Sequence, residues 1–173
     1  PYYKRNLKVA LPVMLTQLGA SLVGFFDSIM VGHYATVDLA AVSFSNAIFF
    51  TVMVFAMGAL MGITPLVGIQ VGANQADCSK SHHSVIAALF QNGVLFTILL
   101  SAVMLVLLGT CIPFLDHFGQ DPEVINAARP YYILIVISLV PFLFFSFFKQ
   151  FLEGLGNTVV AMVITLLMNG LNI

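Results

Sequence analysis

The sequence contains very little charge. Of its 173 residues only thirteen are Lys, Arg, Asp or Glu, two are cysteines and none is tryptophan. A soluble domain carries about 25% charged residues, because most of its surface must be compatible with water. The low charge excludes such a domain, and two cysteines exclude a disulfide-stapled secreted scaffold. The net charge of −1 gives no basic surface for nucleic acid, so the predicted partner is the lipid bilayer.

Long apolar runs take the place of the missing charge. The segments 39–76, 81–115, 130–148 and 154–173 contain no Lys, Arg, Asp or Glu. A helix needs about 20 apolar residues to cross a bilayer, whereas barrel strands alternate over about ten residues. We therefore predict an all-α, polytopic transmembrane helix bundle. Its five spans are predicted at about 7–33, 43–70, 84–111, 127–151 and 158–173.

The basic residues indicate the orientation of these spans. With a cytoplasmic N-terminus, only Arg129 of the six basic residues lies outside, which agrees with the positive-inside rule. The remaining five are Lys4, Arg5, Lys8, Lys80 and Lys149. We therefore expect a multi-pass protein of the plasma (inner) membrane. This topology puts Cys78 and Cys111 on opposite sides, where they cannot form a disulfide.

Both ends of the sequence suggest part of a larger protein. The chain opens on Pro1 without an initiating Met, and the last span has only about 16 residues after Thr158, near the lower limit for crossing a bilayer. We therefore expect residues 1–173 to be a fragment of a larger polytopic protein.

Asp27 is the single charge that lies within a predicted span away from its ends, because Lys8, Arg129 and Lys149 lie within three residues of a span end. At 100° per residue, Thr16, Gln17 and Ser28 share with it a polar, small-residue face, opposite a stripe of Leu, Ile, Met and Phe. A carboxylate at this depth costs about 2.5 kcal/mol or more unless it meets a cavity, a partner, a cation or a proton. Asp27 is therefore predicted to carry a proton or bind a cation. A structural Asp satisfied by neighbouring hydroxyls and amides is the alternative.

The last span carries a second polar face. Thr165, Asn169 and Asn172 follow i, i+4, i+7 spacing. Asn carbonyl oxygens suit an alkali cation beside a carboxylate, and Asn also forms ordinary interhelical hydrogen bonds. The spacing does not distinguish these two roles.

Other features have structural interpretations. Pro65 and Pro141 are expected to kink helices, and the glycines of 58–62 and 68–72 are interpreted as close helix packing. The side chains of the Phe-rich stretch 142–151 are interpreted as facing lipid or neighbouring helices, and the alternative is that they line an apolar substrate cavity. His82 and His83 lie near Cys78, but the spacing fits no zinc site. No catalytic motif or cofactor fingerprint appears, so neither an enzyme nor a cofactor is predicted.

Several segments together resemble the multidrug and toxic compound extrusion family. They occur in the family's order and spacing over nearly the whole chain. The segments are GFFDSIMVG (24–32), DLAAVS (38–43), QVGA (70–73), DPEV (121–124) and FLEGLGNT (151–158).

The resemblance implies a cation-coupled antiporter that exports organic, often cationic, compounds with a sodium or proton gradient. It implies twelve helices in two pseudo-symmetric lobes, so that this chain is most of the N-terminal lobe and a C-terminal lobe is missing. Asp27 and Asn172 match coupling-ion residues of the family, with Na⁺ as the one possible metal. Tyr131 or Tyr132 matches a family tyrosine. Asp27 is expected to bind the ion and bias a kink near Pro12 during alternating access.

Two alternatives remain. A flippase for lipid-linked glycans or polyprenyl lipids would share the architecture, but such proteins hold a pyrophosphate with several basic residues, and no basic residue lies mid-span here. A non-transporting membrane scaffold would leave the cost of Asp27 unexplained.

Overall fold

The computed structural model describes residues 2–34, 36–76 and 83–172. Side chains are described for residues 36–73 and 84–167, and for part of the first helix: residues 7, 10, 11, 13–15, 17–19, 21–26, 29 and 30. Six α-helices and one short 3₁₀ helix make up this part of the chain, without a strand. They are α1 (Tyr2–Tyr34), α2 (Thr36–Met61), α3 (Ile63–Ala76), α4 (His83–Cys111), η1 (Ile112–His117), α5 (Pro122–Gly154) and α6 (Thr158–Asn172).

The helices agree with the predicted all-α bundle. Three segments within the described residues are long and apolar enough to cross a membrane. They correspond to the second, third and fourth predicted spans and cover Thr36–Ala73, Ser84–His117 and Pro122–Gly154. In α1 and α6 the described apolar stretches are shorter, Val13–Phe26 and Thr158–Leu167.

The second predicted span is divided into two helices one turn before Pro65. Gly62 lies between α2 and α3, outside both helices. Pro65 has no amide hydrogen for the carbonyl of Met61, four residues earlier, and its ring would collide with that carbonyl. The helix therefore ends at Met61 and restarts at Ile63. In α5, by contrast, the helix runs on through Pro130 and Pro141.

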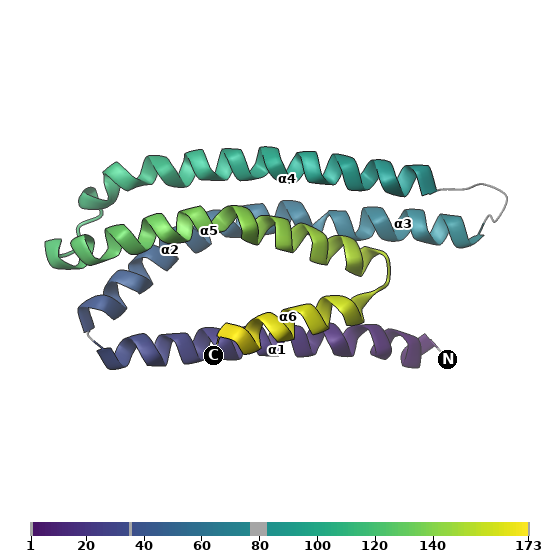
Figure 1. Ribbon diagram of the computed structural model, residues 1–173, viewed down its shortest axis with the longest axis horizontal. Coiled ribbons are helices and arrows are strands. Elements are labelled where there is room, and N and C mark those ends of the chain that lie inside the picture. The colour runs from purple at the N-terminus through teal and green to yellow at the C-terminus, as the bar shows by residue number, and fades with distance from the viewer. Residues whose placement is uncertain (1, 35, 77–82, 173) are drawn as a thin grey trace.

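α5 forms the centre of the packing. It contacts α2, α3 and α4, while α1 pairs with α6, and the two groups meet through α1–α2 and α5–α6 contacts. Figure 1 shows α4 along one edge of the molecule and α1 with α6 along the other, with α2, α3 and α5 between them. The buried residues of α5 recur every three or four positions, as one helix face requires. They include Ile125, Ala128, Tyr132, Val136, Leu139, Leu143, Phe147 and Phe151.

Both ends of α5 are fixed by local hydrogen bonds. The Asp121 carboxylate accepts a hydrogen bond from the backbone N–H of Glu123 at 3.0 Å, and Pro122 is the first helical residue. This confirms the helix start that the acidic residues and proline predict. At the other end Gly156 adopts φ +82°, which favours glycine, and turns the chain into α6.

Candidate functional site

The predicted ion site lies on two helices that pack together. Asp27 belongs to α1, and Asn169 and Asn172 belong to α6. α1 and α6 are in contact, and Figure 1 shows that they run side by side in the same direction. The side chains of Asp27, Asn169 and Asn172 lie outside the described residues, so their approach to one another stays a prediction. The same holds for Ser28 and for a kink at Pro12.

Two hydroxyls on these helices donate their hydrogens within their own helix. The Ser21 hydroxyl donates to the Gln17 carbonyl at 3.0 Å, and the buried Thr165 hydroxyl donates to the Ala161 carbonyl at 2.9 Å. The Gln17 side chain is exposed. Because each hydroxyl hydrogen is engaged within its own helix, the oxygen lone pairs of Ser21 and Thr165 remain free to accept from a cation or a proton donor.

One face of α5 points toward α6. Phe145 and Lys149 lie four residues apart, so they share one face of α5. Phe145 and Lys149 line a groove of about 200 Å³ between α5 and α6. This groove is otherwise lined by Phe148, Leu152, Ala161 and Ile164. The part of α5 that faces α6 across this groove therefore runs from Phe145 to Leu152.

The two neighbouring tyrosines have different surroundings. Tyr131 is half-buried and its hydroxyl donates to Oδ1 of Asn46 on α2 at 3.3 Å. Tyr132 lies 100° further round the helix, is fully buried, and donates to the Leu108 carbonyl of α4 at 3.0 Å. Tyr132 is thus part of the core, whereas Tyr131 with Asn46 remains the candidate for a cavity wall. Sequence reasoning missed Asn46, which follows Ser43 and Ser45 in an otherwise apolar run.

The Phe-rich stretch has two roles rather than one. Phe147 and Phe151 are buried in the core, and Phe142 and Phe148 are exposed. Phe90 of α4 lies against the aromatic rings of Phe147, Phe148 and Phe151, with ring centres 5.7, 6.1 and 5.1 Å away. Of these residues, Phe142 and Phe148 are available to lipid or to a cavity.

The glycine-based packing prediction was wrong for Gly58 and Gly72. Both are exposed, and a Cβ atom at either position would meet no atom of the described residues within 4 Å. The closest approaches lie at other glycines. A Cβ at Gly93 would collide with the ring of Phe147, and one at Gly154 would lie 2.8 Å from the Cβ of Val67.

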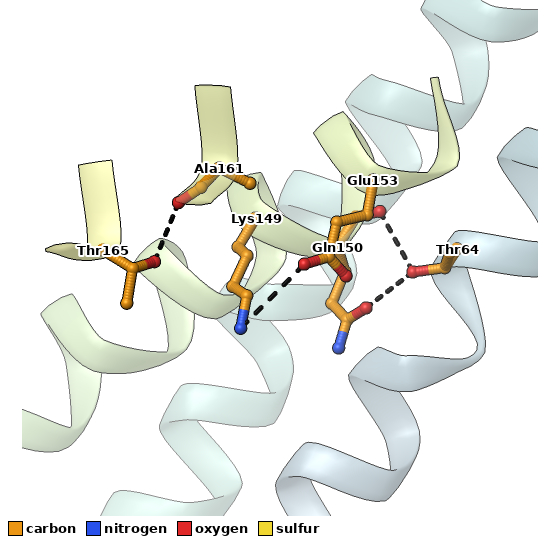
Figure 2. A network of polar contacts seen from close by, with 6 residues as sticks. All are labelled: Thr64, Lys149, Gln150, Glu153, Ala161 and Thr165. Atoms are coloured by element: carbon orange, nitrogen blue, oxygen red, sulfur yellow. Dashed lines mark hydrogen bonds and ion pairs between the residues drawn. The ribbon is translucent and has the colours of Figure 1, made fainter. Parts of the chain in front are cut away.

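A polar cluster that the sequence did not reveal joins α3 to α5. The Thr64 hydroxyl lies 2.6 Å from the side-chain Oε1 of Gln150 and 3.0 Å from the backbone carbonyl oxygen of Gln150. Its one hydrogen is donated toward these two acceptors. On the same turn Lys149 and Glu153 form an ion pair at 4.0 Å, with side chains 24% and 16% exposed. Figure 2 shows the four residues together, with Ala161 and Thr165 of α6 drawn beside them.

Comparisons with known proteins place the chain in a transporter family. The family model MatE matches residues 12–173. Two proteins described as "Probable multidrug resistance protein NorM" are similar to this chain. The one from Oceanobacillus iheyensis is 29% identical, and the match covers 92% of this chain and 34% of the relative. The one from Bacillus thuringiensis is 30% identical, and the match covers 94% of this chain and 34% of the relative. The chain therefore spans about a third of the length of these relatives.

A solved structure shows the same fold. It is described as a MOP superfamily transporter from Pyrococcus furiosus, and it matches with a TM-score of 0.75 at 18% identity, over 95% of this chain and 35% of that protein. The likeness at this identity concerns the fold alone. Together with the apolar helices, the family match identifies a multi-pass membrane protein. The chain belongs to the MatE family.

Proposed function

We propose that the intact protein is a cation-coupled multidrug antiporter, which exports organic, often cationic, compounds by alternating access. The observation that carries the proposal is the pairing of α1 with α6. These are the two helices on which the sequence alone places a carboxylate, Asp27, and the amides Asn169 and Asn172. Family membership and relatives described as multidrug resistance proteins support the same conclusion.

The proposed mechanism couples ion binding to a change in access. Asp27 binds Na⁺ or a proton from the outside, with oxygens of α6 as further ligands, because an uncompensated carboxylate is expensive within a bilayer. The apolar and aromatic face of α5, with the Tyr131–Asn46 hydrogen bond at one end, forms one wall of the substrate path. The N-terminus is cytoplasmic in this proposal, the membrane is the plasma membrane, and the remaining two-thirds of the protein supplies the opposite lobe.

The flippase alternative gains no support from the described residues. The spans Thr36–Ala73 and Ser84–His117 contain no Lys or Arg. In α5, Arg129 binds Asp116 and Lys149 pairs with Glu153, so both cations lie opposite carboxylates rather than in a basic cluster. A pyrophosphate would find no set of basic donors here.

Transport by purified protein tests the proposal. The intact protein is reconstituted into liposomes, and movement of the organic cation ethidium is followed while a sodium gradient or a pH gradient is imposed separately. We expect one gradient to drive ethidium against its concentration difference, and an ionophore that collapses that gradient to stop it. No ethidium movement under either gradient, from protein that is folded and inserted, would contradict the antiporter assignment.

A further inference from the structure

The contact between Thr64 and Gln150 differs from the other hydrogen bonds of Ser and Thr hydroxyls among the described residues, which stay within one helix. Several of these hydroxyls donate to the carbonyl four residues earlier in their own helix. Ser45, Thr51, Thr97, Ser101 and Thr165 do so at 2.7–2.9 Å. Thr64 instead donates to a residue 86 positions away. Since the break at Gly62 separates Thr64 from α2, this hydroxyl ties the start of α3 to α5.

This contact is desolvated and is supported by close backbone packing. Gln150 is only 8% exposed, and a buried amide that loses its partner is costly. One turn further along α5, a Cβ at Gly154 would lie 2.9 Å from the Thr64 carbonyl oxygen and 2.8 Å from the Cβ of Val67, which is fully buried. Hence α3 packs closely against the last turn of α5, from Gln150 to Gly154.

The last turn of α5 also determines where α6 lies. Among the described residues α6 contacts only α1 and α5. Three residues connect α5 to α6, and the backbone N–H of Asn157 donates to the Leu152 carbonyl at 3.0 Å. The Asn157 side chain in turn accepts from the N–H of Val160 at 3.4 Å. Because this three-residue connection is hydrogen-bonded to both helices, a shift of the end of α5 would also shift the start of α6.

We propose that Thr64 and Gln150 are positioning residues for the coupling-ion site. By holding the last turn of α5 against α3, they fix the position of α6 beside α1, and with it the oxygens that complete the site at Asp27. This inference rests on the proposed function. Neither residue touches the ion, so their loss is expected to weaken ion binding and leave the maximal transport rate nearly unchanged.

Replacement of the hydroxyl tests the proposal in ethidium efflux by the intact, reconstituted protein. Thr64→Val keeps the side-chain shape and removes the donor. The Na⁺ or H⁺ concentration that gives half-maximal efflux should rise about 3- to 10-fold, the size of a typical coupling between sites. Thr64→Ser should restore the wild-type value. Thr97→Val is the control, because Thr97 is more deeply buried than Thr64 but its hydroxyl donates to Gly93 of its own helix, α4.

A second variant separates positioning from stability. Gln150→Met removes the Oε1 acceptor at similar length, and the double variant with Thr64→Val should be no worse than Thr64→Val alone, since Thr64→Val already removes the contact that Gln150→Met removes. An unchanged half-saturating concentration in Thr64→Val, or an equal change in Thr97→Val, would overturn the inference. So would loss of folding in both Thr64→Val and Gln150→Met, because it would make the contact structural only.

The two proposals fail in different ways. If the wild-type protein shows no ion-driven efflux, the proposed function is wrong. If the wild type is ion-driven and Asp27→Asn abolishes this, while Thr64→Val behaves as the wild type, only the positioning role is wrong.

Discussion

Substitution of Gly154 by alanine tests the packing between α3 and α5. A Cβ at this position would lie 2.8 Å from the Cβ of Val67, 2.9 Å from the carbonyl oxygen of Thr64 and 3.1 Å from Cγ1 of Val67. Two of these three neighbours cannot rotate away, because one is a backbone atom and the other is the branch point of a buried, β-branched side chain. The added methyl group must therefore push the two helices apart.

The size of the effect follows from opposing terms. Overpacking of a fitted interior costs about 1–3 kcal/mol, and replacing glycine by alanine in a compatible backbone returns roughly 0.4–1 kcal/mol. We expect a net loss of about 1–2 kcal/mol for Gly154→Ala. Gly72→Ala is the control, since Gly72 lies inside α3 and a Cβ there would meet no atom of the described residues within 4 Å. It should be neutral or stabilising by up to about 1 kcal/mol.

The assay is the temperature at which half of the purified intact protein loses its monodisperse form after heating in detergent. Such unfolding is usually irreversible, so the comparison between variants carries the information. Gly154→Ala should lose this form at a lower temperature, with a shift smaller than the about 2–4 °C per kcal/mol of a 150–250-residue domain, because the shift decreases as the protein becomes larger. Equal stability of Gly154→Ala and Gly72→Ala would refute the close approach of α3 to α5.

Two further substitutions probe single contacts by the same heating assay. Tyr132→Phe removes the hydrogen bond to the Leu108 carbonyl. It should destabilise the protein by about 0.6 kcal/mol, the average for such bonds in membrane helices. A loss above about 2 kcal/mol would mean that the hydroxyl does more than bond to α4. Arg129→Gln removes an exposed ion pair with Asp116, whose two carboxylate oxygens both lie 3.0 Å from the Arg129 guanidinium. The loss of stability should be less than about 1 kcal/mol and should become smaller with added salt. A loss that salt leaves unchanged would contradict an exposed pair.

The helix limits could be predicted because local chemistry determines them. The run free of charge between Arg129 and Lys149 indicates the fourth span, and Asp121–Pro122 indicates where its helix begins. Pro65 predicts a disturbance of the second span. The break falls at Gly62, because a proline acts on the carbonyl of the preceding turn.

The contacts between helices could not be predicted, because their partners are far apart in sequence. Tyr131 bonds to Asn46 across 85 residues and Gln150 to Thr64 across 86, and no local pattern specifies either pair. The choice between Tyr131 and Tyr132 depended on a helix rotation of 100° that only the packing of α5 reveals. Likewise Gly58 and Gly72 have the spacing of a packing motif, but no described helix covers them.

For the ion site, the residues are a prediction from the sequence, and the structure brings their helices together. α1 and α6 are adjacent, which is the arrangement that Asp27, Asn169 and Asn172 require in order to meet. Whether the three side chains coordinate one ion stays a prediction.

The most direct test of the central claim compares Asp27→Asn with Asp38→Asn in ion-driven ethidium efflux by the reconstituted, intact protein. Both variants make the same chemical change, and Asp38 is exposed in the first turn of α2. We predict that Asp27→Asn abolishes the response to the driving gradient while Asp38→Asn retains it. Gradient-driven efflux that is unchanged in Asp27→Asn would contradict the account.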